Sequence, residues 1–194
     1  MIVRLADRQL KTKFGVFHEY LYYDGQKESV ALVMGDVKHQ SSVLCRVHSA
    51  CMAAHVFNSI ECDCREQMEI AQALIQQEDK GVIIWLDQEG RGNGHFALIN
   101  SAKYAVEHGV SQTEAYKTLG FSEDARDYSR ASEILTDLGV ESIVLITNNP
   151  DKKNNLIGSG INVVGTKPAV MDVSRNDDLR NYYADKKNRG HNIK

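Results

Sequence analysis

Three cysteines with an unusual spacing are the residues of this sequence best suited to chemistry. Cys51, Cys62 and Cys64 form the pattern C-x10-C-x-C, and the remaining cysteine, Cys45, precedes them by a few residues. Cys62 and Cys64 are too close together for an ordinary disulfide, and cysteine clusters of intracellular proteins more often bind metal or take part in catalysis. Three thiolates can hold a tetrahedral Zn2+ and leave its fourth position open, which is the arrangement of catalytic zinc sites. The alternative is a set of buried thiols that pack as small hydrophobes.

These three thiolates are the expected zinc ligands. A zinc ion with an open position lowers the pKa of bound water toward ~7 and thereby supplies a hydroxide nucleophile near neutral pH. Cys45 lies in an alternating apolar run and is most simply a strand residue. His48 and His55 are further possible ligands, although histidines in such positions are more often ordinary polar residues.

Two loops that follow apolar runs are suited to binding phosphate. The first, residues 88–94, holds three glycines, whose backbone N–H groups can approach an anion, and Arg91, which can grip phosphate bidentately. The second, residues 147–153, leads from Thr147 into a helix start at Pro150 with lysines behind it, and helix N-termini attract phosphate. The alternatives are a flexible turn and a helix cap with solvated lysines. Beside a zinc site, the two loops together favour a phosphorylated substrate.

A carboxylate and a guanidinium lie two residues apart further along the chain. Asp124 and Arg126 share one face if the segment is extended. Such a pair can serve as a base with an anion clamp. Taken alone, the pair is more simply an ion pair on the surface.

The elements that must position these residues alternate between strands and helices. The first fifty residues are β-rich, and Met68, Ala71, Leu74 and Ile75 then form a helical stripe that begins after Arg65 and is expected to end at Gly81. The expected strands are 14–20, 29–34, 42–48, Val82–Leu86, Ser142–Thr147 and Ile161–Val164. The other expected helices are Phe96–Val106, Ala131–Leu138 and one that begins at Pro150.

This order predicts an α/β fold, with a β-rich N-terminal part followed by a largely parallel sheet with flanking helices. Ligands of such sheets bind beyond the carboxyl ends of the strands, where both loops are placed. We expect a single catalytic domain over 1–172 and a charged, partly mobile tail over 173–194.

Composition excludes several classes of function. The 194 residues are 42% hydrophobic and carry a formal net charge of −3, which does not fit a generic nucleic-acid-binding surface. The longest apolar runs are far shorter than the ~20 residues that span a bilayer, and the start MIVRLADRQLK lacks the apolar core of a signal peptide. The expectation is a cytoplasmic protein that contacts neither nucleic acid nor membrane.

In combination, these motifs resemble the GTP cyclohydrolase II family over residues 10–191. The likeness is carried by Arg46-Val47-His48-Ser49, Cys51, Cys62-Asp63-Cys64, Gln67, Gln88-Glu89-Gly90-Arg91, Leu119-Gly120-Phe121, Asp124-x-Arg126-Asp127, Leu138-Gly139-Val140, Thr147-Asn148-Asn149-Pro150-x-Lys152 and Gly160-Ile161. The tail matches loosely through Asn176, Tyr182 or Tyr183, Lys186 and Gly190-His191.

The resemblance implies an enzyme of riboflavin biosynthesis that hydrolytically opens the imidazole ring of GTP. It releases formate and pyrophosphate and leaves 2,5-diamino-6-ribosylamino-pyrimidinone 5'-phosphate. Family enzymes depend on zinc, use Mg2+ with the triphosphate and are typically homodimers. The resemblance assigns the zinc to Cys51, Cys62 and Cys64, proton acceptance to Asp124, and attack on the α-phosphorus to Arg126. It assigns contacts with the nucleotide to Arg46, Val47, His48, Ser49, Gln67, Glu89, Gly90, Arg91, Thr147 and Lys152.

The sequence departs from the family pattern at several positions. Ala50 stands where the family has an acid, Arg65 where it has glycine, Asp87 where a basic residue is common, and His95 lies in an altered glycine-rich loop. The family's catalytic tyrosine corresponds to Tyr104 only with a two-residue shift, since an ungapped match gives Ala102. The loss of the acid and the gain of Arg65 suggest altered contacts with the base or altered placement of the phosphates. These changes leave two alternatives open. The first is a diverged paralogue that opens GTP or another nucleotide to a different product, with the formamide retained or pyrophosphate not released. The second is a non-catalytic, zinc-stabilised nucleotide sensor.

Overall fold

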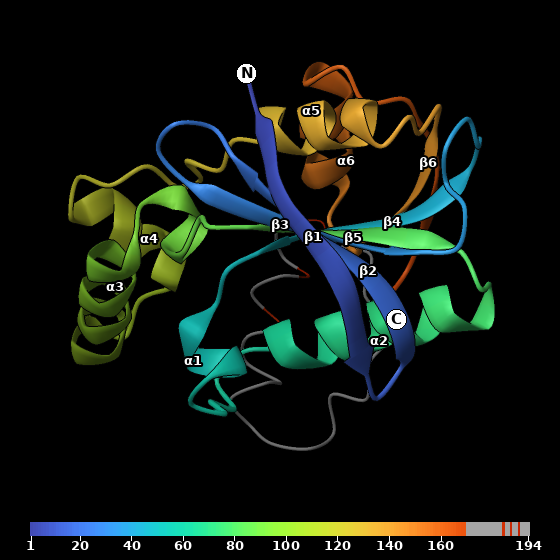
Figure 1. Cartoon of the computed structure of the whole chain (residues 1–194). Coiled ribbons are helices and arrows are strands. Elements are labelled where there is room, and N and C mark those ends of the chain that lie inside the picture. The colour runs from blue at the N-terminus through green and yellow to red at the C-terminus, as the bar shows by residue number, and fades with distance from the viewer. Residues whose placement is uncertain (170–183, 185–186, 188–189, 191–194) are drawn as a thin grey trace.

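A computed structural model describes residues 1–169, 184, 187 and 190. These residues contain a seven-stranded sheet with the order β1-β2-β3-β5-β4-β6-β7 (Figure 1). Its strands are β1 Val3–Thr12, β2 Gly15–Tyr23, β3 Glu28–Met34, β4 Val43–Ser49, β5 Gly81–Leu86, β6 Ile143–Ile146 and β7 Val163–Lys167. Most of the predicted tail over 173–194, including Asn176, Tyr182, Tyr183 and Lys186, lies outside the described residues, so the division at 172 stays a prediction.

The sheet has an antiparallel half and a parallel half. Strands β1, β2, β3 and β5 pair antiparallel in succession, whereas β5, β4, β6 and β7 are parallel. This arrangement confirms the predicted class, a β-rich N-terminal part that continues into a parallel sheet with flanking helices. Strand β1 was missed as a separate element because most of its side chains are exposed on both faces, which leaves no apolar alternation to read.

Helices cover both faces of the sheet (Figure 1). The helices are α1 Met52–His55, α2 Cys64–Gln77, α3 His95–His108, α4 Gln112–Thr118, α5 Ser129–Asp137 and α6 Pro150–Gly158, with a short 3-10 turn, η1, at Gly90–Gly92. Helix α2 packs on one face against Phe17, Leu44 and Ile83. Helices α5 and α6 pack on the other, where Ile134 and Leu156 meet inward side chains of β4, β5 and β6. Helices α3 and α4 pack against each other to one side of the sheet.

Local capping chemistry explains where several helices begin and end. The Ser111 hydroxyl accepts the Glu114 N–H at the start of α4, and the Asn149 side chain accepts the Asp151 N–H ahead of Pro150 at the start of α6. Helix α3 ends at Gly109, whose φ of 65° places it in the left-handed region. The end of α3 and the start of α6 agree with the predicted positions to within a few residues, whereas α4 was not predicted.

Two predicted boundaries are wrong. Gly81 does not end a helix, because α2 stops at Gln77 and Gly81 is the first residue of β5. A Cβ on Gly81 would lie 2.6 Å from Ile75 Cγ1 and 2.9 Å from the Leu44 carbonyl oxygen, so the glycine permits close packing of strand and helix. The last strand is Val163–Lys167 rather than Ile161–Val164. No helix in the described part of the chain combines the length and the apolar character needed to cross a membrane.

Candidate active site

The predicted site residues come together at one edge of the parallel sheet. Strands β4, β5 and β6 run in the same direction, so the segments that follow Ser49, Leu86 and Ile146 leave from the same edge. A cavity of about 380 Å³ lies among these segments, within the usual size of small-ligand sites. Its lining includes Arg46, His48, Ser49, Ala50, Cys51, Cys62, Cys64, Gln67, Gln88, Glu89, Gly90, Arg91, His95, Leu98, Ile99, Ala102, Gln112, Tyr116, Arg126, Thr147, Asn149 and Lys152.

Cys51, Cys62 and Cys64 form a thiol cluster on the cavity wall. Their Sγ atoms all lie within 4.8 Å of one another, and those of Cys51 and Cys62 are 3.7 Å apart. Three thiolates around a tetrahedral zinc, each at ~2.3 Å, are separated by about 3.8 Å, so the cluster fits that ion. Hydrogen bonds from Cys62 and Cys64 lower the pKa of Cys51, and the same bonds raise the pKa of Cys62 and Cys64, so the three thiols share their protons as one group.

Cys45 is separate from this cluster. It is fully buried in β4, and burial raises the pKa of its thiol to about 12. The prediction that Cys45 is a strand residue is therefore confirmed.

The segment that carries Cys51 is fixed from two sides. The Glu89 carboxylate accepts the Met52 N–H at 2.9 Å, which joins the start of α1 to the glycine-rich loop. The Arg65 guanidinium donates to the Ala54 carbonyl at 2.8 and 2.6 Å and to the His55 carbonyl at 2.7 Å. Arg65 does not line the cavity. This departure from the family pattern therefore acts on the backbone beside the cysteine cluster, whereas the sequence had suggested altered contacts with base or phosphate.

Arg46 and Lys152 place two buried cationic side chains at the strand ends. Arg46 donates to the Ile146 carbonyl at 3.0 Å and to the Gln67 side-chain oxygen. Lys152 Nζ donates to the Val47 carbonyl at 2.6 Å. Burial, reinforced by the neighbouring charges of Arg46 and Arg126, holds the pKa of Lys152 well below its ordinary value. An anion would offset this cost, so the chemistry of these two side chains is suited to binding phosphate.

We expect Lys152→Met to stabilise the fold while abolishing nucleotide binding. The change removes a desolvated cation but leaves the Val47 carbonyl without this donor, so the expected gain in free energy of unfolding is small, about 1 kcal/mol. Because the folded-state pKa of Lys152 is depressed, its cost is greatest at low pH and fades as pH rises through that pKa toward the unfolded value. Urea unfolding across the pH range should show the gap between variant and wild type narrowing as pH increases. Lys153→Met, at the next position, is the matched control and should show neither effect.

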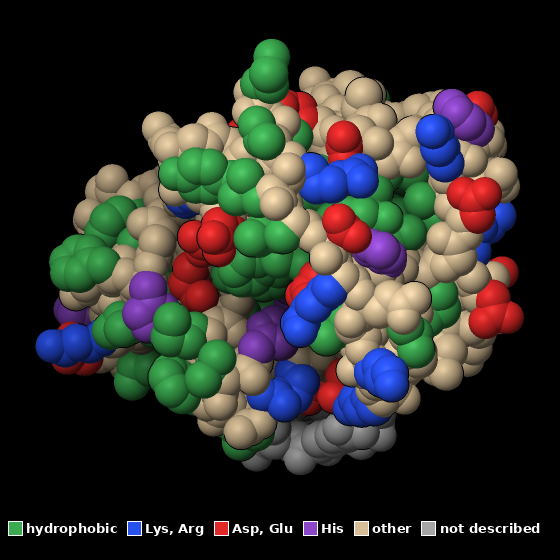
Figure 2. All heavy atoms as spheres, viewed as in Figure 1, with side chains coloured by type: hydrophobic (Ala, Val, Ile, Leu, Met, Phe, Trp, Pro, Cys, Tyr) green, Lys and Arg blue, Asp and Glu red, His purple; other side chains and the backbone are tan. Residues whose placement is uncertain are grey.

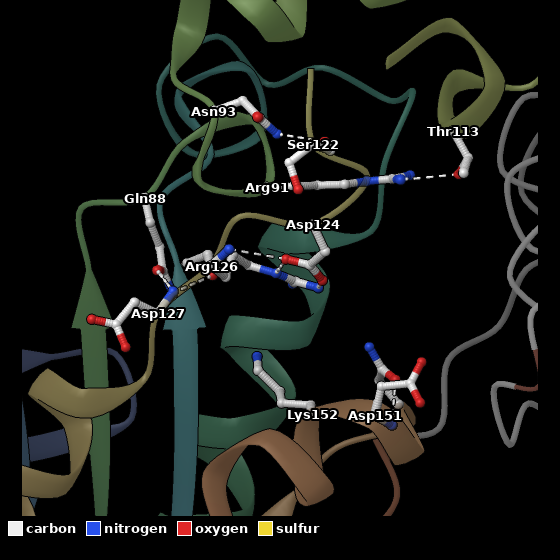
Figure 3. Close-up of polar contacts among 12 residues, drawn as sticks. Gln88, Arg91, Asn93, Thr113, Ser122, Asp124, Arg126, Asp127, Asp151 and Lys152 are labelled. Carbon is white, nitrogen blue, oxygen red and sulfur yellow. Dashed lines mark hydrogen bonds and ion pairs between the residues drawn. The ribbon is translucent and has the colours of Figure 1, made fainter. Parts of the chain in front are cut away.

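Gln67 and Gln88 tie the strand ends to the loops. Gln67 accepts from Arg46 and donates to the Asp63 carboxylate at 2.5 Å, so both ends of its amide are engaged. Gln88 donates to the Ser49 hydroxyl at 3.2 Å and accepts the Asp127 N–H at 3.1 Å (Figure 3). Gln88 was part of the recognised motif but not of the predicted site. Its place at the start of the motif Gln88-Glu89-Gly90-Arg91 is the sequence signal that could have indicated its positioning role.

Asp124 and Arg126 form a bidentate ion pair beside the cavity (Figure 3). Arg126 Nε donates to Asp124 Oδ1 at 2.8 Å, and a terminal guanidinium nitrogen donates to Oδ2. Burial alone would raise the pKa of Asp124, but the hydrogen bonds and charge of Arg126 outweigh it, and the pKa lies below its usual value. The predicted pair is thus together and charged, with Arg126 on the cavity wall.

The glycine-rich loop is joined to the segment that carries this pair. The Arg91 carbonyl accepts the Ala125 N–H at 2.9 Å, and Arg91 itself has a left-handed φ of 55°. Its guanidinium donates to the Thr113 hydroxyl at 3.0 Å, and Asn93 donates to the Ser122 carbonyl at 2.9 Å (Figure 3). Gly92 permits this contact, because a Cβ there would lie 2.5 Å from the Ala125 carbonyl oxygen.

We expect Gly92→Ala to displace the Asp124–Arg126 segment, and Gly94→Ala to leave it in place. Both glycines have a left-handed φ, of 84° and 90°, so both variants share the cost of that conformation. Only at Gly92 does the new methyl group meet backbone, whereas nothing lies within 4 Å at Gly94. Chemical denaturation should show an extra loss of roughly 1–3 kcal/mol for Gly92→Ala. Equal losses in the two variants would contradict the proposed close contact.

The two candidate histidines lie next to each other, with their ring centroids 5.1 Å apart. His48 lines the cavity and is 3% exposed, and neither of its ring nitrogens has a partner among the described residues. Burial and the charges of Arg46 and Lys152 hold its pKa well below its ordinary value, so the ring is neutral. His55 donates through Nδ1–H to the Cys51 carbonyl, 2.9 Å away, and does not line the cavity.

Three predicted residues do not line the cavity, and Asp124, which lies beside it as the partner of Arg126, is one of them. The Val47 side chain is buried in the core, although its carbonyl holds Lys152. Tyr104 does not line the cavity but stacks on His108 with ring centroids 3.9 Å apart, and Ala102 occupies the wall instead. Among the departures from the family pattern, Ala50 and His95 line the cavity and Asp87 does not.

Comparison with known proteins places these observations in a family. A family model described as GTP cyclohydrolase II matches residues 3–168, most of the chain. The chain belongs to the GTP cyclohydrolase II family. The predicted recognition is thereby confirmed, and with it membership of a family of hydrolases.

Relatives of this GTP cyclohydrolase II family chain are named for riboflavin biosynthesis. It is 40% identical to a riboflavin biosynthesis protein RibBA of Bacillus cereus over 98% of its own length and 48% of that protein. The corresponding protein of Endomicrobium trichonymphae is 37% identical over 100% of the chain and 48% of its own length. The chain therefore spans about half the length of these curated relatives. A crystal structure of RibBX, a two-domain 3,4-dihydroxy-2-butanone 4-phosphate synthase from A. baumannii, matches 86% of this chain and 40% of its own at a TM-score of 0.49 and 25% identity.

Proposed function

We propose that this chain hydrolytically opens the imidazole ring of GTP in a zinc-dependent reaction, releasing formate and pyrophosphate. The product would be 2,5-diamino-6-ribosylamino-pyrimidinone 5'-phosphate. The observation that carries the proposal is the single cavity lined by the thiol cluster, the cations at the strand ends and Arg126. Family membership and the RibBA relatives support the same activity and a place in riboflavin biosynthesis.

Residues in two parts of the cavity have different proposed roles, metal binding and phosphate binding. Cys51, Cys62 and Cys64 would hold the zinc, which when bound supplies an open position where water is activated near neutral pH. Arg46 and Lys152 would bind the phosphates of the Mg2+-bound triphosphate, and the 90–92 turn would contact the rest of the nucleotide. These groups fix the distance between the phosphates and the base, so the nucleotide is held with its base toward the thiol cluster.

Asp124 and Arg126 suit the second part of the reaction, the release of pyrophosphate. The resemblance assigns attack on the α-phosphorus to Arg126 and acceptance of its proton to Asp124. In the structure Asp124 already accepts hydrogen bonds from two guanidinium nitrogens, and its lowered pKa keeps it ionised and able to accept a proton. A homodimer and a cytoplasmic location are parts of the proposal that rest on the resemblance.

A diverged paralogue is the second candidate, because departures from the family pattern lie on the cavity wall. Ala50, His95 and Ala102 all line it, whereas the cysteines, Asp124 and Arg126 are retained. Such an enzyme could retain the formamide, keep pyrophosphate attached or accept another nucleotide.

One assay separates these possibilities. The zinc-loaded chain is incubated with GTP and Mg2+, and formate, pyrophosphate and pyrimidine absorbance are followed together. Formate with pyrophosphate supports the proposed reaction. Ring opening without one of these products, or turnover of another nucleotide only, indicates the paralogue. Tight GTP binding with no turnover would contradict an enzyme and indicate a nucleotide sensor.

A further inference from the structure

Tyr116 is a buried tyrosine on the cavity wall that sequence reasoning did not single out. It lies on α4 and is 0% exposed, yet it belongs to the cavity lining. Its hydroxyl is buried and has no hydrogen-bond partner among the described residues. Buried polar groups are nearly always paired, so an unpartnered hydroxyl on a ligand cavity indicates a group that is completed by the ligand.

The other candidate tyrosines differ from Tyr116 in position. Tyr104 is outside the cavity lining, stacked on His108. Tyr128 also has a buried hydroxyl without a partner, but it too is absent from the lining and packs in the core near Lys152. Tyr116 is thus the one of the three that combines an unpartnered hydroxyl with access to the cavity.

The surroundings of Tyr116 indicate what kind of group it meets. Leu98, Ile99 and Ala102 form an apolar stretch of cavity wall on α3. A Cβ built on Gly90 would lie 3.4 Å from the Tyr116 hydroxyl and 3.2 Å from Leu98 Cβ, so hydroxyl, glycine and apolar wall adjoin. Figure 2 shows hydrophobic side chains gathered on the face that carries α3 and α1. An apolar wall with a few placed polar groups suits a flat heterocycle better than phosphate.

The ring of Tyr116 is held in place by its neighbours. The Arg91 guanidinium lies 5.3 Å from the ring centroid, and Phe121 meets the ring edge-on at 6.3 Å. Burial raises the pKa of the phenol, so the hydroxyl keeps its proton near neutral pH and can act as a donor. The nearby Ser101 hydroxyl interacts with the phenol, but it donates to the Leu98 carbonyl at 3.0 Å and makes no hydrogen bond of good geometry with the Tyr116 hydroxyl. His95 Nδ1, also buried and without a partner among the described residues, is a second polar group on this wall.

We propose that the Tyr116 hydroxyl hydrogen-bonds the purine base of the bound nucleotide, while the α3 wall packs against the base. This inference rests on the proposed function and adds to it a residue that reads the base. Phosphate contacts are supplied elsewhere, by Arg46 and Lys152 at the ends of β4 and β6.

The test compares Tyr116→Phe with Tyr104→Phe in the zinc-loaded full chain. Calorimetry measures affinity for a non-hydrolysable GTP analogue, and steady-state assays give kcat and KM. We expect Tyr116→Phe to weaken binding about tenfold, the usual effect of losing one hydrogen bond. Its thermal midpoint should be equal or higher, because an unpartnered hydroxyl has been removed from the interior. Tyr104→Phe should match wild type in both affinity and rate.

Nucleotides with altered bases show whether the contact is with the base. Inosine triphosphate lacks the 2-amino group, and 2-aminopurine riboside triphosphate lacks the 6-oxo group. One of these analogues lacks the base atom that Tyr116 contacts, and it should bind to wild type and to Tyr116→Phe with equal affinity. Unchanged GTP affinity in Tyr116→Phe overturns the inference. So does an equal loss of affinity for purine and pyrimidine triphosphates. A fall in thermal midpoint large enough to account for the loss of affinity also overturns it. Failure of wild type to turn over GTP overturns the proposed function instead, and is measured separately from these affinities.

Discussion

Cys62→Ser is expected to abolish zinc binding and ring opening together. A serine hydroxyl does not ionise near neutral pH, so the change removes one of three thiolate ligands whose Sγ atoms lie within 4.8 Å of one another. Removing a group that hydrogen-bonds to a metal ligand typically lowers metal affinity or activity by about 10–100-fold. Removing a ligand itself should therefore lower formate release by at least about a hundredfold. Metal analysis of the purified chain and formate release from GTP measure the two effects.

Cys45→Ala is the matched control for this prediction. Cys45 is also a cysteine near the site, but its thiol is buried in β4 and its pKa is raised to about 12. The control should retain its zinc and its ring-opening rate, with a modest loss of stability from the smaller side chain. A Cys62→Ser chain that releases formate at the wild-type rate without bound zinc would refute the metal assignment.

The division of the cysteines could be predicted because it depends on local sequence. Cys62 and Cys64 are separated by one residue at the start of a helix, and Cys51 directly follows a strand, so short-range geometry brings their thiols toward one edge. The parallel order of β4, β5 and β6 then places both predicted loops beside them. The β-rich start and the parallel second half of the sheet could be predicted for the same reason, from apolar runs and glycine-marked ends.

Val47, Tyr104 and Tyr116 show where sequence reasoning fails. The resemblance includes Val47 because it carries the motif Arg46-Val47-His48-Ser49 over whole, although Arg46 and His48 alternate with the core residues on the opposite face of β4. Tyr104 and Tyr116 lie on α3 and α4, and only the packing of these two helices decides which tyrosine reaches the cavity. Helix α4 is seven residues long and gave no periodic signal to place it.

The hydrogen-bond partners of Arg65 could not be predicted from the sequence either. Its position in the cysteine motif suggested a contact with the nucleotide, yet its guanidinium is used by the Ala54 and His55 carbonyls. The backbone of α1 turns toward α2 only in the folded chain, so no spacing in the sequence reveals these acceptors.

Arg126→Ala is expected to separate the two halves of the reaction. Arg126 lines the cavity and clamps Asp124, but the thiol cluster depends on neither residue. Pyrophosphate release should fall by about a thousandfold or more, the scale seen when a member of a catalytic unit is removed. Formate release should stay within about tenfold of wild type. Both products are measured from the same reaction mixture, so their ratio is independent of the amount of active protein.

The pH dependence of the variant tests the pairing of Arg126 with Asp124 directly. In wild type the hydrogen bonds and charge of Arg126 hold the pKa of Asp124 below its usual value against the opposing effect of burial. Without the guanidinium the hydrogen bond from the backbone N–H of residue 126 and the charge of Arg91 remain, but the largest contributions that lower the pKa of Asp124 are lost. The pKa therefore rises, and the acid limb of the residual pyrophosphate release moves to higher pH. Arg126→Lys, the matched control, keeps a positive charge but loses the two-pronged contact, and its acid limb should lie between the other two. A parallel fall in formate and pyrophosphate, with an unmoved acid limb, would mean that Arg126 only binds the nucleotide and that the base for pyrophosphate release lies elsewhere in the cavity.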